Sequence, residues 1–120
     1  MESFSKADRP EAGGNKSLGA SVEGALDKDT IREVVRANIV DIRHCYNSGL
    51  TREPGLAGRV VIEFTIGTDG KVVSSRRGDG TDLADGEASQ CMAEAVSHWT
   101  FPAPEQGVVQ VRYPFVLSPG

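Results

Sequence analysis

The chain has 120 residues, 38% of them hydrophobic, and a net charge of −4, which is the size and composition of one small globular domain. The negative charge argues against a nucleic-acid binder, because such proteins place an excess of Lys and Arg against phosphates. No apolar run approaches the length that spans a bilayer, and no segment resembles a signal peptide. Such a chain is either cytosolic or a piece excised from a longer protein, and composition alone does not separate the two.

Glycine and polar residues dominate the first part of the chain, with a Gly-Gly-Asn-Lys-Ser run at residues 13–17. A segment of this kind buries too little apolar area to offset the entropy lost on ordering it. We therefore predict a flexible linker over residues 1–26 and a folded domain over residues 27–120.

A first helix is predicted over residues 29–47. Asp27 or Asp29 can cap its start, and Gly49 is placed to end it. Its apolar residues recur at the three- and four-residue spacing of one side of an α-helix, namely Ile31, Val34, Val35, Ile39, Ile42, Cys45 and Tyr46.

A β-hairpin is predicted next. Residues 59–66 alternate between apolar and other side chains, as a half-buried strand does, and residues 71–76 form its partner. The Gly-Thr-Asp-Gly turn at residues 67–70 joins them, with Gly70 in the left-handed conformation that a Cβ would strain.

A second helix and a third strand complete the pattern. The helix is predicted over residues 85–99, with an apolar stripe that includes Cys91, Met92 and Trp99, and prolines after it prevent its continuation. The strand is predicted over residues 108–117, at a sheet edge because Pro114 lacks a ladder donor. The expected class is α+β, in the order α-β-β-α-β, with two helices packed on one face of a three-stranded antiparallel sheet.

Cys45 and Cys91 lie on the apolar stripes of the two predicted helices. Because both helices pack on one sheet face, these stripes meet, so the two cysteines can form a disulfide across the seam. It would close a loop of about 45 residues and contribute roughly 4 kcal/mol, and it would imply an oxidising compartment. Two unpaired buried thiols are the alternative.

Catalysis is not expected. The sequence has no Gly-x-Ser-x-Gly elbow and no phosphate-binding glycine loop. Cys91 and His98 would lie about 10 Å apart along their helix, too far for a nucleophilic pair. We predict no catalytic residues and no cofactor.

Two metal sites are weaker hypotheses, and we predict no metal. Zinc would need Cys45 and Cys91 with His44 and His98, but helix neighbours such as His44 and Cys45 point about 100° apart. Calcium would use acidic residues whose spacing lacks the rhythm of an EF-hand loop, so a solvated, helix-capping loop is the better interpretation of Asp79, Asp82, Asp85 and Glu87.

Three arginines, Arg59, Arg76 and Arg77, fall near one end of the predicted hairpin. Charges on exposed strands usually form a solvated face and discourage aggregation. A basic patch that meets an acidic partner or peptidoglycan is the alternative.

Several motifs together are characteristic of a known family. The first half carries Cys45-Tyr46, the segment of residues 56–66 and Asp-Gly-Lys-Val at 69–72; the second carries Cys91-Met92, Trp-Thr-Phe-Pro at 99–102 and Tyr-Pro-Phe at 113–115. Over roughly residues 27–118 the chain resembles the AgmX/PglI-type C-terminal domain, a branch of the TonB C-terminal superfamily found in gliding-motility proteins of myxobacteria.

The resemblance implies a periplasmic, TonB-like domain at the C-terminal end of an inner-membrane-anchored protein. Such proteins connect a proton-driven motor to outer-membrane components, so protein–protein interaction in the cell envelope and energy transduction are expected, without nucleic-acid binding or membrane insertion by this fragment. In that superfamily the partner adds an extended segment to the sheet edge. The residues matching that edge are Gln110, Val111, Arg112, Tyr113, Pro114, Phe115 and Val116. The alternative is a self-associating structural domain of an envelope scaffold, whose last strand pairs with its own copy.

Overall fold

The computed structural model describes residues 20–119, so most of the predicted linker lies outside the described residues. The elements in chain order are β1 (Ser21–Glu23), α2 (Lys28–Ala37), α3 (Ile39–Arg52), β2 (Gly58–Ile66), β3 (Val72–Arg77), α4 (Gly86–Val96) and β4 (Val109–Leu117). Within this part of the chain, every helix is too short or too polar to traverse a bilayer.

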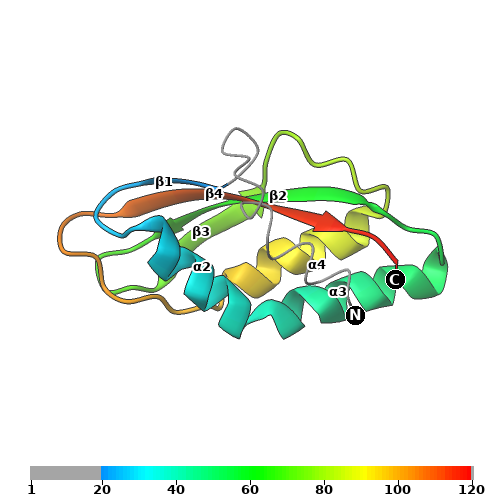
Figure 1. The fold of residues 1–120 in the computed structure, drawn as a ribbon, viewed down its shortest axis with the longest axis horizontal. Helices are drawn as coiled ribbons and strands as arrows, with labels where there is room; N and C mark the ends of the chain where they lie inside the picture. Colours follow the sequence, from blue (N-terminus) through cyan, green and yellow to red (C-terminus); the bar gives the residue numbers. More distant parts are fainter. Residues whose placement is uncertain (1–19, 120) are drawn as a thin grey trace.

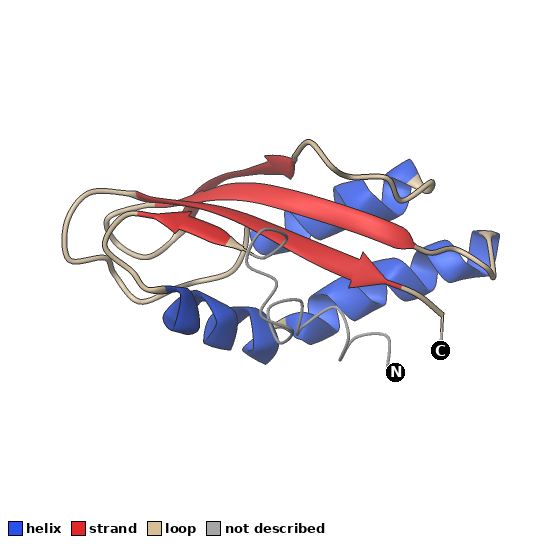
Figure 2. Ribbon diagram, turned by 45° about the horizontal axis from the view of Figure 1, so that its top comes forward, coloured by secondary structure: helices blue, strands red, loops and turns tan. Residues whose placement is uncertain are grey.

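The strands form one antiparallel sheet in the order β1-β4-β2-β3. Figures 1 and 2 show the helices gathered on one face of this sheet, which leaves the other face without a helical layer. The predicted α+β class and the one-sided layering are confirmed. The predicted number of elements was wrong, because residues 20–119 contain a fourth strand, β1, and the first helix is divided in two.

The break in the first helix occurs at Asn38. Its backbone leaves the helical range (φ −113°, ψ 13°), and its side-chain amide donates to the carbonyl of Val34 at 2.8 Å. Asparagine offers the backbone this local alternative to the helical ladder. The predicted continuous helix therefore becomes α2 and α3, which both still bury apolar residues, Ile31 and Val35 from α2 and Ile42 from α3.

The prediction that Gly49 ends the helix was wrong. It lies inside α3, where a Cβ would come within 2.7 Å of the Leu56 side chain and 3.1 Å of the Ala88 Cβ. The glycine therefore permits close packing of α3 against α4. The helix ends at Arg52, just before Pro54.

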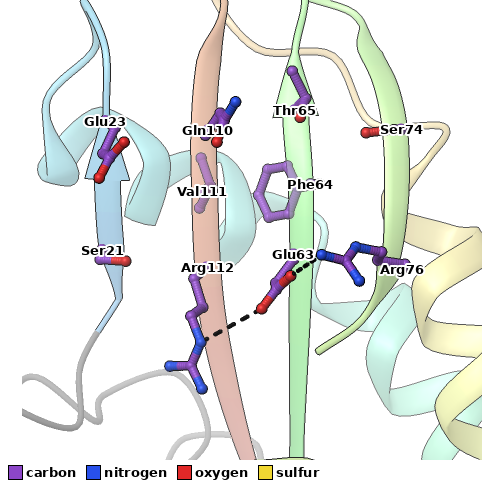
Figure 3. Close-up of a pocket in the computed structure, with 10 residues that line it drawn as sticks. All are labelled: Ser21, Glu23, Glu63, Phe64, Thr65, Ser74, Arg76, Gln110, Val111 and Arg112. Atoms are coloured by element: carbon purple, nitrogen blue, oxygen red, sulfur yellow. Dashed lines mark ion pairs between the residues drawn. The ribbon is translucent and has the colours of Figure 1, made fainter. Parts of the chain in front are cut away.

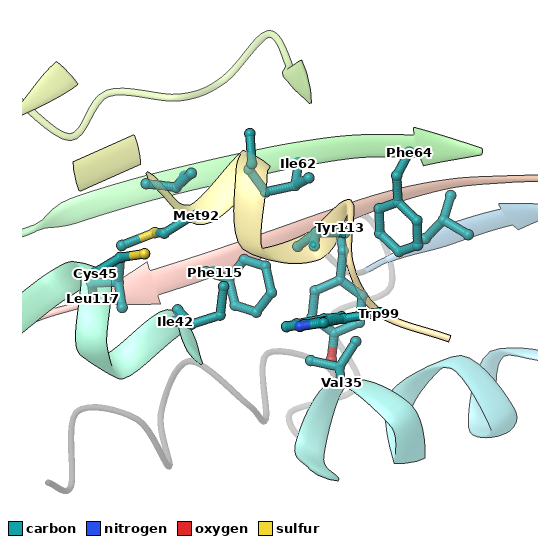
Figure 4. Close-up of a cluster of buried hydrophobic side chains, with 14 of the residues drawn as sticks. Val35, Ile42, Cys45, Ile62, Phe64, Met92, Trp99, Tyr113, Phe115 and Leu117 are labelled. Carbon is teal, nitrogen blue, oxygen red and sulfur yellow. The ribbon is translucent and has the colours of Figure 1, made fainter. Parts of the chain in front are cut away.

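The core fills the space between the helices and the inner face of the sheet, as Figure 4 shows. Alternate residues of β2 and β4 face it, among them Ile62, Phe64, Tyr113, Phe115 and Leu117. The helices contribute Ile42 and Met92, and Trp99 closes one end by donating its indole N–H to Asp41 at 2.9 Å.

β1 was missed because it is short and lies in the polar segment assigned to the linker. Val22 is its one apolar residue facing the helices, and it is half-buried, whereas Ser21 and Glu23 are exposed. The strand pairs with β4 over Gln110 to Arg112. β4 is therefore an interior strand at this end, and the prediction that it forms the sheet edge throughout was wrong.

The predicted disulfide between Cys45 and Cys91 is present in the seam between α3 and α4, with the two Cα atoms 5.6 Å apart. It crosslinks residues separated by 46 positions. The loop-entropy relation assigns such a bond about 4 kcal/mol, by restricting the unfolded chain.

We therefore expect reductant to lower the free energy of unfolding of the domain by about 4 kcal/mol, measured by urea titration with and without dithiothreitol. A Cys45→Ala/Cys91→Ala variant is the control, because its transition should not respond to reductant. An equal midpoint for oxidised and reduced wild type would contradict this account.

The hairpin turn confirms the prediction for Gly70, whose φ is +89°. The amide of Phe101 donates to the Gly70 carbonyl at 2.8 Å, so the turn is held against the chain that follows α4. A Cβ at Gly70 would clash with the carbonyl oxygen of Phe101. Backbone, rather than a flexible side chain, occupies that space.

Gly70→Ala should therefore destabilise the domain by about 1–3 kcal/mol, since it combines a strained conformation with a backbone clash. Gly55→Ala is the matched control, because nothing lies within 4 Å of its added Cβ, and its effect should stay within about 0.5 kcal/mol. Thermal or urea unfolding of the two variants measures the difference; similar losses would show that the turn tolerates a side chain.

Candidate partner-binding surface

The backbone of β2 alternates between its two neighbours, and this alternation determines which backbone groups of β4 face outward. The amide of Val61 donates to the Thr81 hydroxyl at 2.9 Å, and its carbonyl accepts from the amide of Gly78 at 2.7 Å. Arg59 likewise donates to the Asp82 carboxylate at 2.7 Å and accepts from the Asp82 amide at 2.9 Å. Both residues of β2 thus turn their backbone groups toward the loop of residues 78–83, away from β4.

β4 shows the same alternation, because its residues are paired one to one with those of β2. Val61 is opposite Pro114, and Arg59 is opposite Val116. In an antiparallel pair, a residue opposite a non-bonded position directs its own N–H and C=O to the other side. Pro114 and Val116 therefore point their backbone groups away from β2. The missing N–H of Pro114 removes nothing from the β2–β4 ladder, which explains why proline is accepted in this strand.

Gln110 and Arg112 have the same alternation as Pro114 and Val116, so their backbone groups also face away from β2. Here β1 occupies that side, with Glu23 opposite Gln110 and Ser21 opposite Arg112. Among residues 20–119, no strand covers the corresponding side of Pro114 and Val116. Val111, Tyr113, Pro114 and Phe115 are buried, whereas Gln110, Arg112 and Val116 are exposed. The predicted site thus consists of a part that β1 covers, residues 110–112, and a part that no described strand covers, residues 114–116. We call the second part the open part of β4.

A polar groove of about 360 Å³ lies on the sheet face that has no helices. Figure 3 shows its side chains in cross-strand rows, one of which places Ser21, Arg112, Glu63 and Arg76 side by side. Glu63 binds Arg76 at 2.7 Å and lies 3.7 Å from Arg112. Arg112 also donates to the carbonyl of Asp79 at 2.7 Å. The row therefore contains two arginines and one glutamate, and Glu63 lies between the two arginines.

The three arginines suggested as a basic patch do not gather at one place. Arg76 points into the groove toward Glu63, whereas Arg77 points to the helix side and donates to the Ser89 hydroxyl at 3.2 Å. Arg59 lies opposite Val116, near the open part of β4. The adjacent arginines of β3 therefore serve opposite faces of the sheet.

A second groove of about 360 Å³ follows the seam between α3 and α4, lined by Asp41, His44, Glu94, Ala95, His98 and the disulfide. Because Cys45 and Cys91 are bonded to each other, they are not available as the thiolate ligands that the zinc hypothesis required. The part of the chain that is described contains no group of three or more His, Cys, Asp or Glu side chains arranged to hold a metal.

Three of the four acidic residues suggested for calcium, Asp82, Asp85 and Glu87, contact protein groups through their carboxylates. The carboxylate of Asp82 accepts from the amide of Arg59. That of Asp85 accepts from the amide of Ala88 at 3.0 Å, as the N-cap of α4, and from the Arg52 guanidinium at 2.8 and 3.1 Å. Arg52 also lies 3.4 Å from Glu87. These contacts fasten the end of α3 to the start of α4.

The Arg52 hydrogen bond, followed by that from the Ala88 amide, lowers the pKa of Asp85 below its ordinary value of 3.8. A carboxyl group whose pKa is lower in the folded state stabilises the fold above its unfolded pKa. That contribution disappears as the pH falls through the folded pKa.

Asp85→Asn keeps a good helix cap but removes the charge. We expect this variant to lose stability at pH 7 and to show a weaker fall in stability below about pH 4, measured by urea unfolding at a series of pH values. Glu87→Gln, which leaves the Asp85–Arg52 contact in place, should keep the wild-type pH dependence. An unchanged pH profile in Asp85→Asn would assign the acid sensitivity to another group.

Comparisons with known proteins return one structural similarity. The solution NMR structure of the TonB C-terminal domain of Helicobacter pylori (residues 179–285) is 24% identical; the alignment covers 80% of this chain and 95% of that one, with a TM-score of 0.44. No family model matches the sequence, and no curated protein matches it. The case for a binding function therefore rests on the backbone geometry of β4.

Proposed function

We propose that this chain is a TonB-like coupling domain of the bacterial cell envelope, without catalytic activity. In this proposal it lies in the periplasm, belongs to a protein tied to a proton-driven inner-membrane motor, and binds an outer-membrane partner. The sequence motifs that resemble the gliding-motility branch suggest motility as the process served. The partner binds by adding an extended strand along β4.

The observation that carries this proposal is the open part of β4. The amide and carbonyl of Val116, an exposed residue, face a side that no described strand occupies, whereas Pro114 on the same side is buried. Backbone groups that no described strand takes up are of the kind to which an extended peptide adds. The side chain of Val116 is 42% exposed, so an apolar side chain is available beside these groups.

The opposite edge, formed by β3, is less suited to strand addition. Its sequence places Lys71, Arg76 and Arg77 at or beside the strand, and cationic side chains discourage pairing at sheet edges. α4 also packs against β3, with the Ser75 hydroxyl donating to the carbonyl of Ala93 at 2.8 Å. These differences favour β4 as the edge that binds.

The disulfide supports the proposed compartment. Disulfides form and persist in oxidising environments such as the bacterial periplasm and are rare in the cytosol. The bond also joins the two helices behind the sheet, so the domain can carry a pulling load without depending on α3–α4 packing alone.

The decisive experiment replaces Val116, whose backbone N–H faces outward. Val116→Pro removes that donor and places a ring against an incoming strand, while the ladder with β2 does not use it. We expect the capture of outer-membrane proteins by the intact protein, crosslinked in its host cells, to fall at least about tenfold, the equivalent of one lost hydrogen bond.

Val116→Thr is the matched control, because it keeps the N–H and the β-branched shape, and it should capture partners as wild type does. Circular dichroism and thermal unfolding should show both variants folded. Undiminished capture by Val116→Pro would contradict strand addition at β4. A dimer in sedimentation that only this variant loses would instead support the self-associating scaffold.

A further inference from the structure

The open part of β4 is too short to bind a strand well by itself. Beyond β1 it offers the two backbone groups of Val116, because Pro114 is buried and has no N–H to donate. The other complete pairs of outward N–H and C=O groups, those of Gln110 and Arg112, are already taken by β1. A partner strand that used the full edge would need the position of β1.

β1 is held in a way that allows release. Its residues pair with β4 alone, its outer edge is free of any other described strand, and only Val22 packs against the core. Gly24, the residue after β1, has a φ of +134°, which glycine adopts without the strain that a Cβ would cause. Short segments with exposed hydrogen bonds and few apolar contacts are the parts of a fold that open locally.

We propose that β1 is an intramolecular placeholder for the partner strand. The partner's extended segment displaces β1 and pairs antiparallel with β4 from Gln110 to Val116. This inference rests on the proposed function, and it adds that the site is closed in the free domain. Binding is therefore weakened by the equilibrium that holds β1 in place.

The contacts of β1 indicate the chemistry of the segment that replaces it. On the helix side, opposite Val111, β1 presents an apolar β-branched residue, Val22. On the groove side it presents Ser21 opposite Arg112, and Glu23 opposite Gln110. Opposite charges in directly facing positions stabilise antiparallel pairs.

The Arg112 side chain is 43% exposed and lies 3.7 Å from Glu63, so its guanidinium can meet a further carboxylate in the groove. The partner segment that fits best is therefore an antiparallel strand with a β-branched apolar residue opposite Val111. It carries an acidic residue opposite Arg112.

The test uses full-length variants that differ in one backbone donor. Since Glu23 faces Gln110 in the bonded alternation, Glu23→Pro removes an N–H donated to β4 and releases β1. Glu23→Ala is the matched control, because it removes the same carboxylate but keeps the N–H. The probe is a synthetic peptide with the sequence of residues 16–24, and a second peptide carries Asp at the position of Ser21.

Binding is followed by NMR shifts of the backbone amides of the domain. We expect the peptide to bind Glu23→Pro at least about tenfold more tightly than wild type or Glu23→Ala, because the placeholder no longer competes. The shifts should centre on the amides of Gln110, Arg112 and Val116. The peptide with Asp should bind more tightly than the parent peptide, and Arg112→Gln in the Glu23→Pro background should abolish that gain.

Equal affinity for Glu23→Pro and Glu23→Ala, or no binding to either, would overturn the placeholder. Shifts centred on Ser75 and Arg77 would move the site to β3 and overturn it as well. These results are independent of outer-membrane capture in cells. If the peptide binds as expected but no outer-membrane protein is captured, the coupling function is refuted and the exchange of β1 stands. If capture is unaffected by Glu23→Pro, the placeholder alone is refuted.

Discussion

The constraint on which the rest of the structure depends is the backbone alternation of β2. This strand pairs with β4 along its whole length, and every second residue is left to bond on the other side. β3 takes those groups at one end, and the loop of residues 78–83 takes them at the other, through Gly78, Thr81 and Asp82. As a consequence β2 has no open edge among residues 20–119. The backbone groups that face outward belong to alternate residues of β4, on the side away from β2.

The one-sided helical layer has a second consequence. α3 and α4 bury the inner face of the sheet and are joined to each other by the disulfide and by the contact between Arg52 and Asp85. The groove face and the outer side of β4 take no part in this packing. In the proposed exchange the β2–β4 ladder would stay paired, because the outward backbone groups of β4 take no part in it.

The two borders of the sheet avoid unwanted pairing by different means. β3 carries cations and is packed against α4, with Arg77 donating to Ser89. β4 is covered over part of its length by β1, and Pro114 interrupts the remainder. Exposed edges are aggregation hazards that proteins commonly block with charge, proline or covering segments. A covering segment is the one of these devices that can be removed reversibly, and the proposed exchange at β4 depends on this difference.

The sequence alone determined most of the local elements and the core, but neither β1 nor the break at Asn38. The helical spacing around Ile31 and Met92, the alternation through Phe64 and the left-handed turn at Gly70 depend on neighbouring residues, so periodicity revealed them. It also placed Cys45 and Cys91 on facing stripes, because a helix has one apolar side. Tertiary structure alone decided that β4 is an interior strand where β1 meets it, that Gly49 is a packing residue, and that Arg76 and Arg77 serve opposite faces. Those facts depend on pairing between segments far apart in the chain, and the three residues of β1 carry no periodic signal long enough to show that they form a strand.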